Sequence, residues 1–192
     1  AEIILAGIHS DAGRYDKAEP LAKAALDYRI RLLGRDADAV ALSHNALGGI
    51  QRAMGKFDEA EANYRRAMEI RIKQYTSEHA MVAGLLSNLG GLNRARKRYP
   101  EAEQDYLKAL AIYRRSNPDN PAQAPTLINL AVVLADQGRL DDAEAAYGRG
   151  LAIRNGLGDD GAAGVLLGRL AALSADRADT TGAEQLLHQA LD

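Results

Sequence analysis

The chain has 192 residues, of which 47% are hydrophobic and 26% charged, and its formal net charge is -2. This is ordinary soluble composition, and the slightly acidic balance gives no general attraction to nucleic acid or to an anionic membrane surface. The absence of cysteine excludes disulfides and thiolate metal sites, and no apolar run approaches the roughly 18 residues that a membrane span needs.

One short motif recurs along the chain at a nearly constant interval. Its clearest copy runs from Gly55 to Glu61 and reads GKFDEAE. The alanine of this motif stands at positions 18, 60, 102, 143 and 183, which gives steps of 42, 42, 41 and 40 residues. A fixed period of this length predicts a helical solenoid, in which each unit packs only on its neighbours.

Each period contains two stretches with helical spacing, and the second period shows them most clearly. Leu47 and Ile50 belong to the first stretch, which Gly55 should end because glycine accepts the left-handed conformation after a last helical turn. Asp58 then opens the next helix, with Glu61 three residues later as in a capping box. The same capping pair is expected at Asp16/Glu19, Asp141/Glu144 and Thr181/Glu184.

Turn-rich connections between the motif copies complete the expected organisation. We expect helices near 2–12, 16–33, 38–54, 58–75, 80–96, 100–115, 122–137, 141–155, 162–176 and 181–191. They form a single array with repeats of approximately 1–36, 37–78, 79–119, 120–160 and 161–192. Because the sequence starts at Ala1 rather than at a methionine, we expect a segment of a longer protein or a processed chain.

Small residues, leucines and tyrosines recur in register with the motif. On the first helix a small residue follows a leucine at Ala6, Gly48, Gly90, Ala131 and Ala171, and on the second helix tyrosine recurs at Tyr64, Tyr106 and Tyr147. This pattern resembles the tetratricopeptide repeat over the whole chain, and the period near 42 resembles the long-helix variety of kinesin light chains. The resemblance implies an all-α fold, a right-handed superhelix of about five antiparallel helix hairpins. Gly48 should let its helix approach Ala60 of the next one closely.

The resemblance also implies where a ligand binds, because the first helix of each pair lines the concave groove. Asn88 and Asn129 occupy the same position one repeat apart, where asparagine in the resembling family holds the backbone of an extended peptide. An asparagine amide offers both a donor and an acceptor, and arginine offers a forked donor for carboxylates. The predicted groove residues are Asn45, Arg52, Asn88, Arg94, Asn129 and Arg169. The open alternative is that the asparagines bond only to neighbouring helices and the arginines are solvated.

No residues form a convincing catalytic or metal-binding set. The four histidines, His9, His44, His79 and His188, lie in different repeats without a second ligand at helical spacing. The basic residues from Arg94 to Arg98 are interpreted as a solvated helix end rather than a nucleic-acid site, because no aromatic platform accompanies them. We therefore expect no enzymatic activity, no metal and no cofactor.

The function predicted from the sequence is that of a protein-protein interaction scaffold. Its partner is expected to be an extended and acidic peptide, or another domain of the parent protein, with no nucleic acid and no membrane. One alternative is a regulatory sensor segment whose superhelix controls an attached effector domain. Another is self-association through the terminal repeats, suggested by the apolar residues Ile3, Ile4 and Leu5. The expected location is cytoplasmic.

Overall fold

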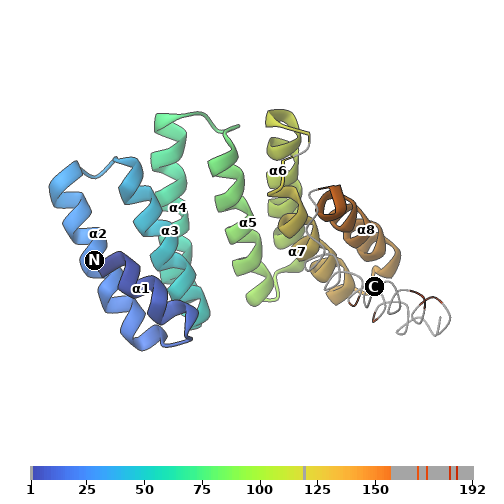
Figure 1. Cartoon of the computed structure of the whole chain (residues 1–192), viewed down its shortest axis with the longest axis horizontal. Coiled ribbons are helices and arrows are strands. Elements are labelled where there is room, and N and C mark those ends of the chain that lie inside the picture. Colours follow the sequence, from blue (N-terminus) through green and yellow to red (C-terminus); the bar gives the residue numbers. More distant parts are fainter. Residues whose placement is uncertain are drawn as a thin grey trace. The chain divides into compact units, whose positions relative to one another are not determined.

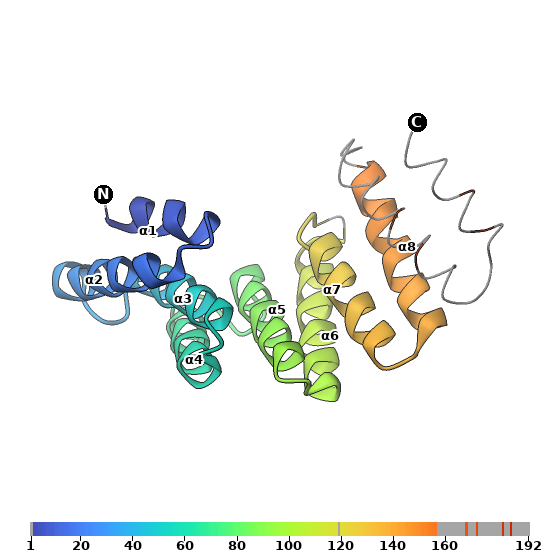
Figure 2. The same cartoon turned by 90° about the horizontal axis from the view of Figure 1, so that it is seen from below.

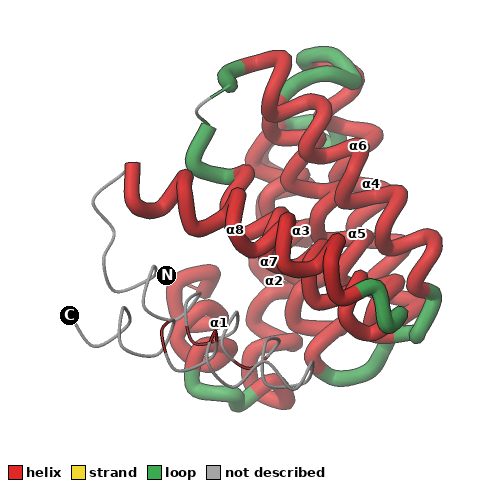
Figure 3. Tube along the Cα trace, turned by 90° about the vertical axis from the view of Figure 1, so that its right-hand side faces the viewer, coloured by secondary structure: helices red, strands yellow, loops and turns green. Residues whose placement is uncertain are grey.

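The fold was analysed in a computed structural model, which describes residues 2–118 and 120–156 together with positions 168, 172, 182 and 185. The described residues form helices joined by short turns and contain no strand (Figure 3). The chain divides into two compact units, residues 1–96 and 97–192, and each is considered by itself. The helices predicted over 162–176 and 181–191, and with them most of the predicted fifth repeat, lie outside the described residues.

The first unit holds two helix hairpins and one further helix (Figure 1). Its helices are α1 (Glu2–Asp11), α2 (Tyr15–Leu33), α3 (Asp38–Ala53), α4 (Phe57–Gln74) and α5 (Ala80–Ala95). Each helix packs against the next in the chain, and α3 also contacts α5. In Figure 2, α1 lies above α2 and α3 above α4, so the first helices of both hairpins face the same side of the unit.

The described part of the second unit contains three helices. They are α6 (Tyr99–Ser116), α7 (Gln123–Asp136) and α8 (Leu140–Gly156). Helix α7 packs against both α6 and α8 around a core that includes Tyr106, Leu127 and Tyr147. In both units the helices predicted within the described residues are present, so the all-α hairpin architecture is confirmed.

Glycine in the left-handed region ends the first helix of a hairpin, as predicted. Gly55 has a φ of 75°, its N–H donates to the Arg52 carbonyl, and the Lys56 N–H donates to the Gln51 carbonyl. This pair of bonds is the Schellman arrangement, which satisfies carbonyls that would otherwise lack partners at the helix end. The same two bonds recur at Gly13 and Gly138. In the third repeat Lys97 takes this position with a φ of 59°, although it carries a side chain.

The predicted capping boxes in the described residues are wrong. The second helices of these pairs begin one residue before the expected acidic cap, at Tyr15, Phe57 and Leu140. Asp58 is therefore a residue of the first turn, while the preceding Lys56 has no capping side-chain hydrogen bond. In the third repeat, Arg98 precedes the second helix and likewise has no capping side-chain hydrogen bond. The Thr181/Glu184 pair lies outside the described residues.

The glutamate that follows the motif alanine instead bonds to the turn of the next repeat. Glu19 lies 2.6 Å from the Lys56 ammonium, Glu61 lies 2.8 Å from the Arg96 guanidinium, and Glu103 lies 2.8 Å from the Arg139 guanidinium. Each cation comes 35 to 37 residues later in the chain. The motif thus joins consecutive repeats as well as forming the turn within one.

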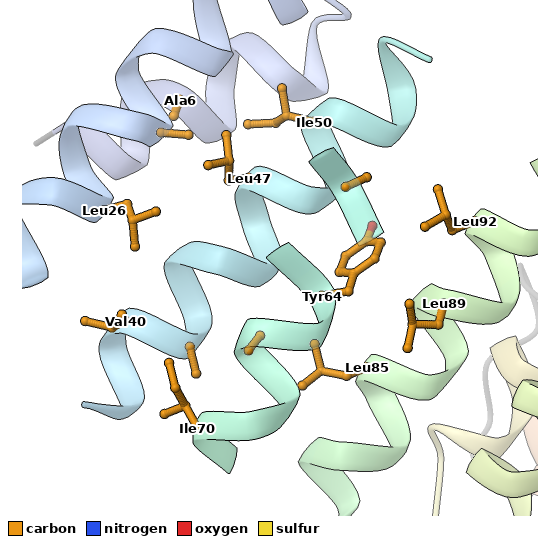
Figure 4. Packing of buried hydrophobic residues seen from close by; sticks show 14 of the residues in the cluster. Ala6, Leu26, Val40, Leu47, Ile50, Tyr64, Ile70, Leu85, Leu89 and Leu92 are labelled. Carbon is orange, nitrogen blue, oxygen red and sulfur yellow. The ribbon is translucent and has the colours of Figure 1, made fainter. Parts of the chain in front are cut away.

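The core of the first unit rests on close helix contact at small residues. Tyr64 of α4 is 1% exposed, and its ring packs against Gly48 of α3. Leu47 and Ile50 point toward the first hairpin (Figure 4). A Cβ atom added at Gly48 would lie 3.2 Å from the Ala60 carbonyl oxygen, so the predicted close approach of α3 and α4 is confirmed. No helix in the described residues has the length and apolar character needed to cross a membrane.

Candidate functional site

Two of the predicted groove asparagines meet on the exposed side of α3 and α5. The Asn88 Nδ2 atom donates to Asn45 Oδ1 at 2.7 Å, and both side chains are half-buried. Neither residue makes another side-chain hydrogen bond in the described part of the chain. Whichever way the two amides are turned, the pair keeps one NH₂ group and one oxygen available for a ligand.

A hollow of about 200 Å³ opens between α1 and α3, and α3 is also the helix that carries Asn45. Its buried lining residues include Ala6, Ala22 and Ser43, and its more exposed ones include Ala46 and Gly49. Gly49, which has no side chain, is one of the residues that leave this space open. Small side chains from α1, α2 and α3 leave this space because they do not fill the distance between the helix backbones.

The predicted arginines have different surroundings. Arg52 is exposed on α3, and its guanidinium bonds to the hydroxyl of the buried Tyr64. Burial raises the pKa of Tyr64, and the positive charge of Arg52 offsets part of that rise. Arg94 is exposed on α5, so it also lies on one of the helices that carry the asparagine pair.

The remaining predicted residues belong to the second part of the chain. Asn129 is exposed on α7 of the second unit, and Arg169 lies outside the described residues. The structure therefore brings Asn45 and Asn88 together. Arg52 lies on the same helix as Asn45, and Arg94 on the same helix as Asn88. Asn129 belongs to the other unit.

Beneath the candidate site lies a buried polar network that the sequence analysis did not predict. Gln51 is 2% exposed, and its amide donates to Glu59 at 2.9 Å and to Glu19 at 3.4 Å. Its oxygen accepts a hydrogen bond of 2.7 Å from Asn63, which in turn lies 2.7 Å from His44. The network links α2, α3 and α4 and fixes α3 against its neighbours. The sequence signal that could have indicated this network is Gln51, a polar residue among the apolar positions of α3.

Nothing in the described residues provides a metal centre. No group of three His, Asp or Glu side chains there is placed to hold a metal ion. The hollow and the asparagine pair offer hydrogen-bonding groups and small apolar walls, so their chemistry is that of recognition by shape and hydrogen bonds.

The helices form antiparallel hairpins with small residues at their contacts. A left-handed residue ends the first helix of each repeat, and it is glycine at positions 13, 55 and 138 and lysine at position 97. These features define a helical-repeat protein. The sequence profile of the tetratricopeptide repeat family matches residues 1–73 and 81–156. The chain therefore belongs to the tetratricopeptide repeat family, and its repeats are of the kinesin-light-chain-like variety.

Solved structures agree with this assignment. BtubC (BKLC) from P. vanneervenii is 25% identical with a TM-score of 0.82, over 97% of this chain and 76% of that one. A Podosopora anserina putative kinesin light chain with nearly identical TPR-like repeats is 19% identical with a TM-score of 0.78, over 98% and 91% of the two chains. PilF from Pseudomonas aeruginosa is 20% identical with a TM-score of 0.70, over 98% and 74%. No curated protein sequence matches the chain.

Proposed function

We propose that this chain is a non-enzymatic interaction scaffold that binds an extended peptide along the first helices α1, α3 and α5. The observation that carries the proposal is the Asn45–Asn88 amide pair, which retains a donor and an acceptor for a ligand. A peptide bond presents one N–H and one C=O, so this pair can hold a backbone without contacting the peptide's side chains. The hollow between α1 and α3 leaves room for that backbone or for one side chain.

An acidic peptide suits the charges on this face. Arg52 and Arg94 are exposed on α3 and α5, and an arginine guanidinium binds a carboxylate with two parallel hydrogen bonds. Asn129 and Arg169 stay predicted groove residues of their own repeats, on the basis of repeat register alone. The cytoplasmic location also stays a prediction.

The double substitution Asn45→Ala/Asn88→Ala tests the groove. We expect it to weaken binding of a peptide selected from a random heptapeptide library by about tenfold, because each lost hydrogen bond contributes about 0.5–1.5 kcal/mol. Fluorescence polarisation measures the affinity. The matched control is Asn155→Ala, which removes an exposed amide from α8 and should leave affinity unchanged. An affinity within about twofold of wild type, or about 0.4 kcal/mol, would refute the groove.

Self-association through the first hairpin is a second interaction that one observation favours. Leu5 and Ile8 of α1 are 45% and 54% exposed. The residues one repeat later, Leu47 and Ile50, are buried at 3% and 4%, and they point toward the preceding hairpin. We propose that a second copy of the chain covers the α1 face. Light scattering should show a dimer that the Leu5→Ser/Ile8→Ser variant abolishes, and a wild-type monomer at high concentration would exclude this contact.

A further inference from the structure

The hollow between α1 and α3 has the size of one side-chain pocket. Its volume of about 200 Å³ is below the roughly 300 Å³ at which pockets begin to hold a drug-sized molecule. Its walls are largely apolar, with Ala6, Ala22, Ala46 and Ile50 among the lining residues. Burying an aliphatic chain there is therefore favourable, by about 25 cal/mol for each Å² of apolar surface removed from water.

Asp11 is the single charged residue in the lining of this hollow. It is exposed and makes no ion pair or hydrogen bond within the described part of the chain. Asp11 is also the last residue of α1, where the partial negative charge of the helix C-terminus adds to that of the carboxylate. The mouth of the hollow is consequently negative.

Two cations close to this region in the sequence, Arg14 and Arg52, have other partners. The Arg14 Nε atom donates to His9 Nδ1 at 2.9 Å, and the Arg52 guanidinium bonds to the Tyr64 hydroxyl. Neither forms an ion pair with Asp11. The negative charge at the hollow is thus available to a ligand.

We infer that the hollow receives a lysine or arginine side chain of the bound peptide. The aliphatic stem lies against the alanine and isoleucine walls while the cationic end reaches Asp11, as long basic side chains do when their stems are buried. This inference rests on the proposed function. It adds that the partner carries a basic residue at the α1–α3 hollow, beside any acidic residue that pairs with Arg52 or Arg94.

Selection from a random heptapeptide phage library on the wild-type chain tests this inference. We expect lysine and arginine together to be enriched more than about threefold at one position, and enrichment of large apolar residues there instead would overturn it. A selected peptide and its lysine-to-norleucine analogue, which keeps the stem and removes the charge, then give a double-mutant cycle with Asp11→Asn. Wild type should bind the norleucine analogue about fivefold more weakly than the lysine peptide. Asp11→Asn should bind the two peptides with equal affinity.

The matched control is Asp27→Asn, an exposed aspartate of α2 that does not line the hollow. It should preserve the fivefold difference between the two peptides. If replacing lysine by norleucine lowered the affinity equally for wild type and for Asp11→Asn, the role of Asp11 would be overturned. The proposed groove would be unaffected by that result. If no peptide binds the wild type more tightly than the Asn45→Ala/Asn88→Ala variant, the proposed function and this inference both fail.

Discussion

Replacing Gly48 by alanine is expected to lower the free energy of unfolding by about 2 kcal/mol. The added Cβ atom would lie 2.9 Å from two ring carbons of Tyr64 and 3.2 Å from the Ala60 carbonyl oxygen. Tyr64 is fully buried and Ala60 is held in a helix, so neither can move without disturbing its own packing. Overpacking a tight core in this way costs about 1–3 kcal/mol. The three close contacts place this site near the upper end of that range, and the better helix propensity of alanine offsets about 1 kcal/mol of the cost. Urea denaturation monitored by circular dichroism measures the change.

Gly49→Ala, one residue further along the same helix, is the matched control with the opposite sign. Its added Cβ atom would meet only the Tyr64 hydroxyl, at 3.8 Å, which is an ordinary contact. Alanine is favoured over glycine inside a helix by about 1 kcal/mol, so this variant should be more stable than wild type. Equal destabilisation by both substitutions would contradict the close packing of α3 on α4.

Removing the charge of Glu19 should cost about 2 kcal/mol at neutral pH. This carboxylate is 8% exposed and pairs with Lys23 at 2.8 Å and Lys56 at 2.6 Å. Hydrogen bonds to charged groups contribute about 1.5–3 kcal/mol, and the partial exposure of both lysines keeps the estimate near the lower end. The substitution Glu19→Gln preserves the shape of the side chain and isolates the charge.

The difference in unfolding free energy between wild type and Glu19→Gln should depend on pH, and measuring that dependence gives a sharper test. The hydrogen bonds from Lys23 and Lys56 lower the pKa of Glu19 from 4.5 to about 2. Because the pKa of the folded state lies below that of the unfolded state, the stabilisation is complete above about pH 4.5 and is lost as the pH falls toward 2. The gap in unfolding free energy between wild type and Glu19→Gln should therefore shrink over this range.

The exposed Glu101 of α6 supplies the control for this measurement. Glu101→Gln should change stability by less than about 0.5 kcal/mol, as surface substitutions usually do. A Glu19→Gln gap that stayed constant between pH 7 and pH 3 would show that the lysine pairs do not stabilise the stacked repeats.

The helices and turns could be predicted because their signals are local. Gly55 ends α3 through its own backbone conformation, and apolar residues at helical spacing identify each helix. The capping boxes failed because a competing partner lies far along the chain. Glu61 was predicted to form a capping box with Asp58, three residues earlier. It pairs instead with Arg96, which belongs to the next repeat. Sequence spacing cannot show that an acidic side chain turns toward the following turn rather than toward its own helix end.

The candidate site was predicted only in part for a similar reason. Repeat register placed Asn45 and Asn88 on the same groove, but at positions one residue apart, and their mutual hydrogen bond depends on how α3 and α5 pack. The hollow beside Asp11 was missed because it is the space that small side chains on three helices leave unfilled. Such a space has no pattern of its own in the sequence.

Binding of a library-selected peptide to Gly49→Leu tests the central claim most directly. Position 49 lines the hollow and accepts a Cβ atom, so leucine should fill the hollow without disturbing the core. The matched control is Gly148→Leu on α8, where an added Cβ atom meets nothing within 4 Å. We expect Gly49→Leu to keep or raise the melting temperature and to weaken peptide binding at least tenfold, while Gly148→Leu leaves binding unchanged. Wild-type affinity in a folded Gly49→Leu variant would contradict a peptide groove on α1 and α3.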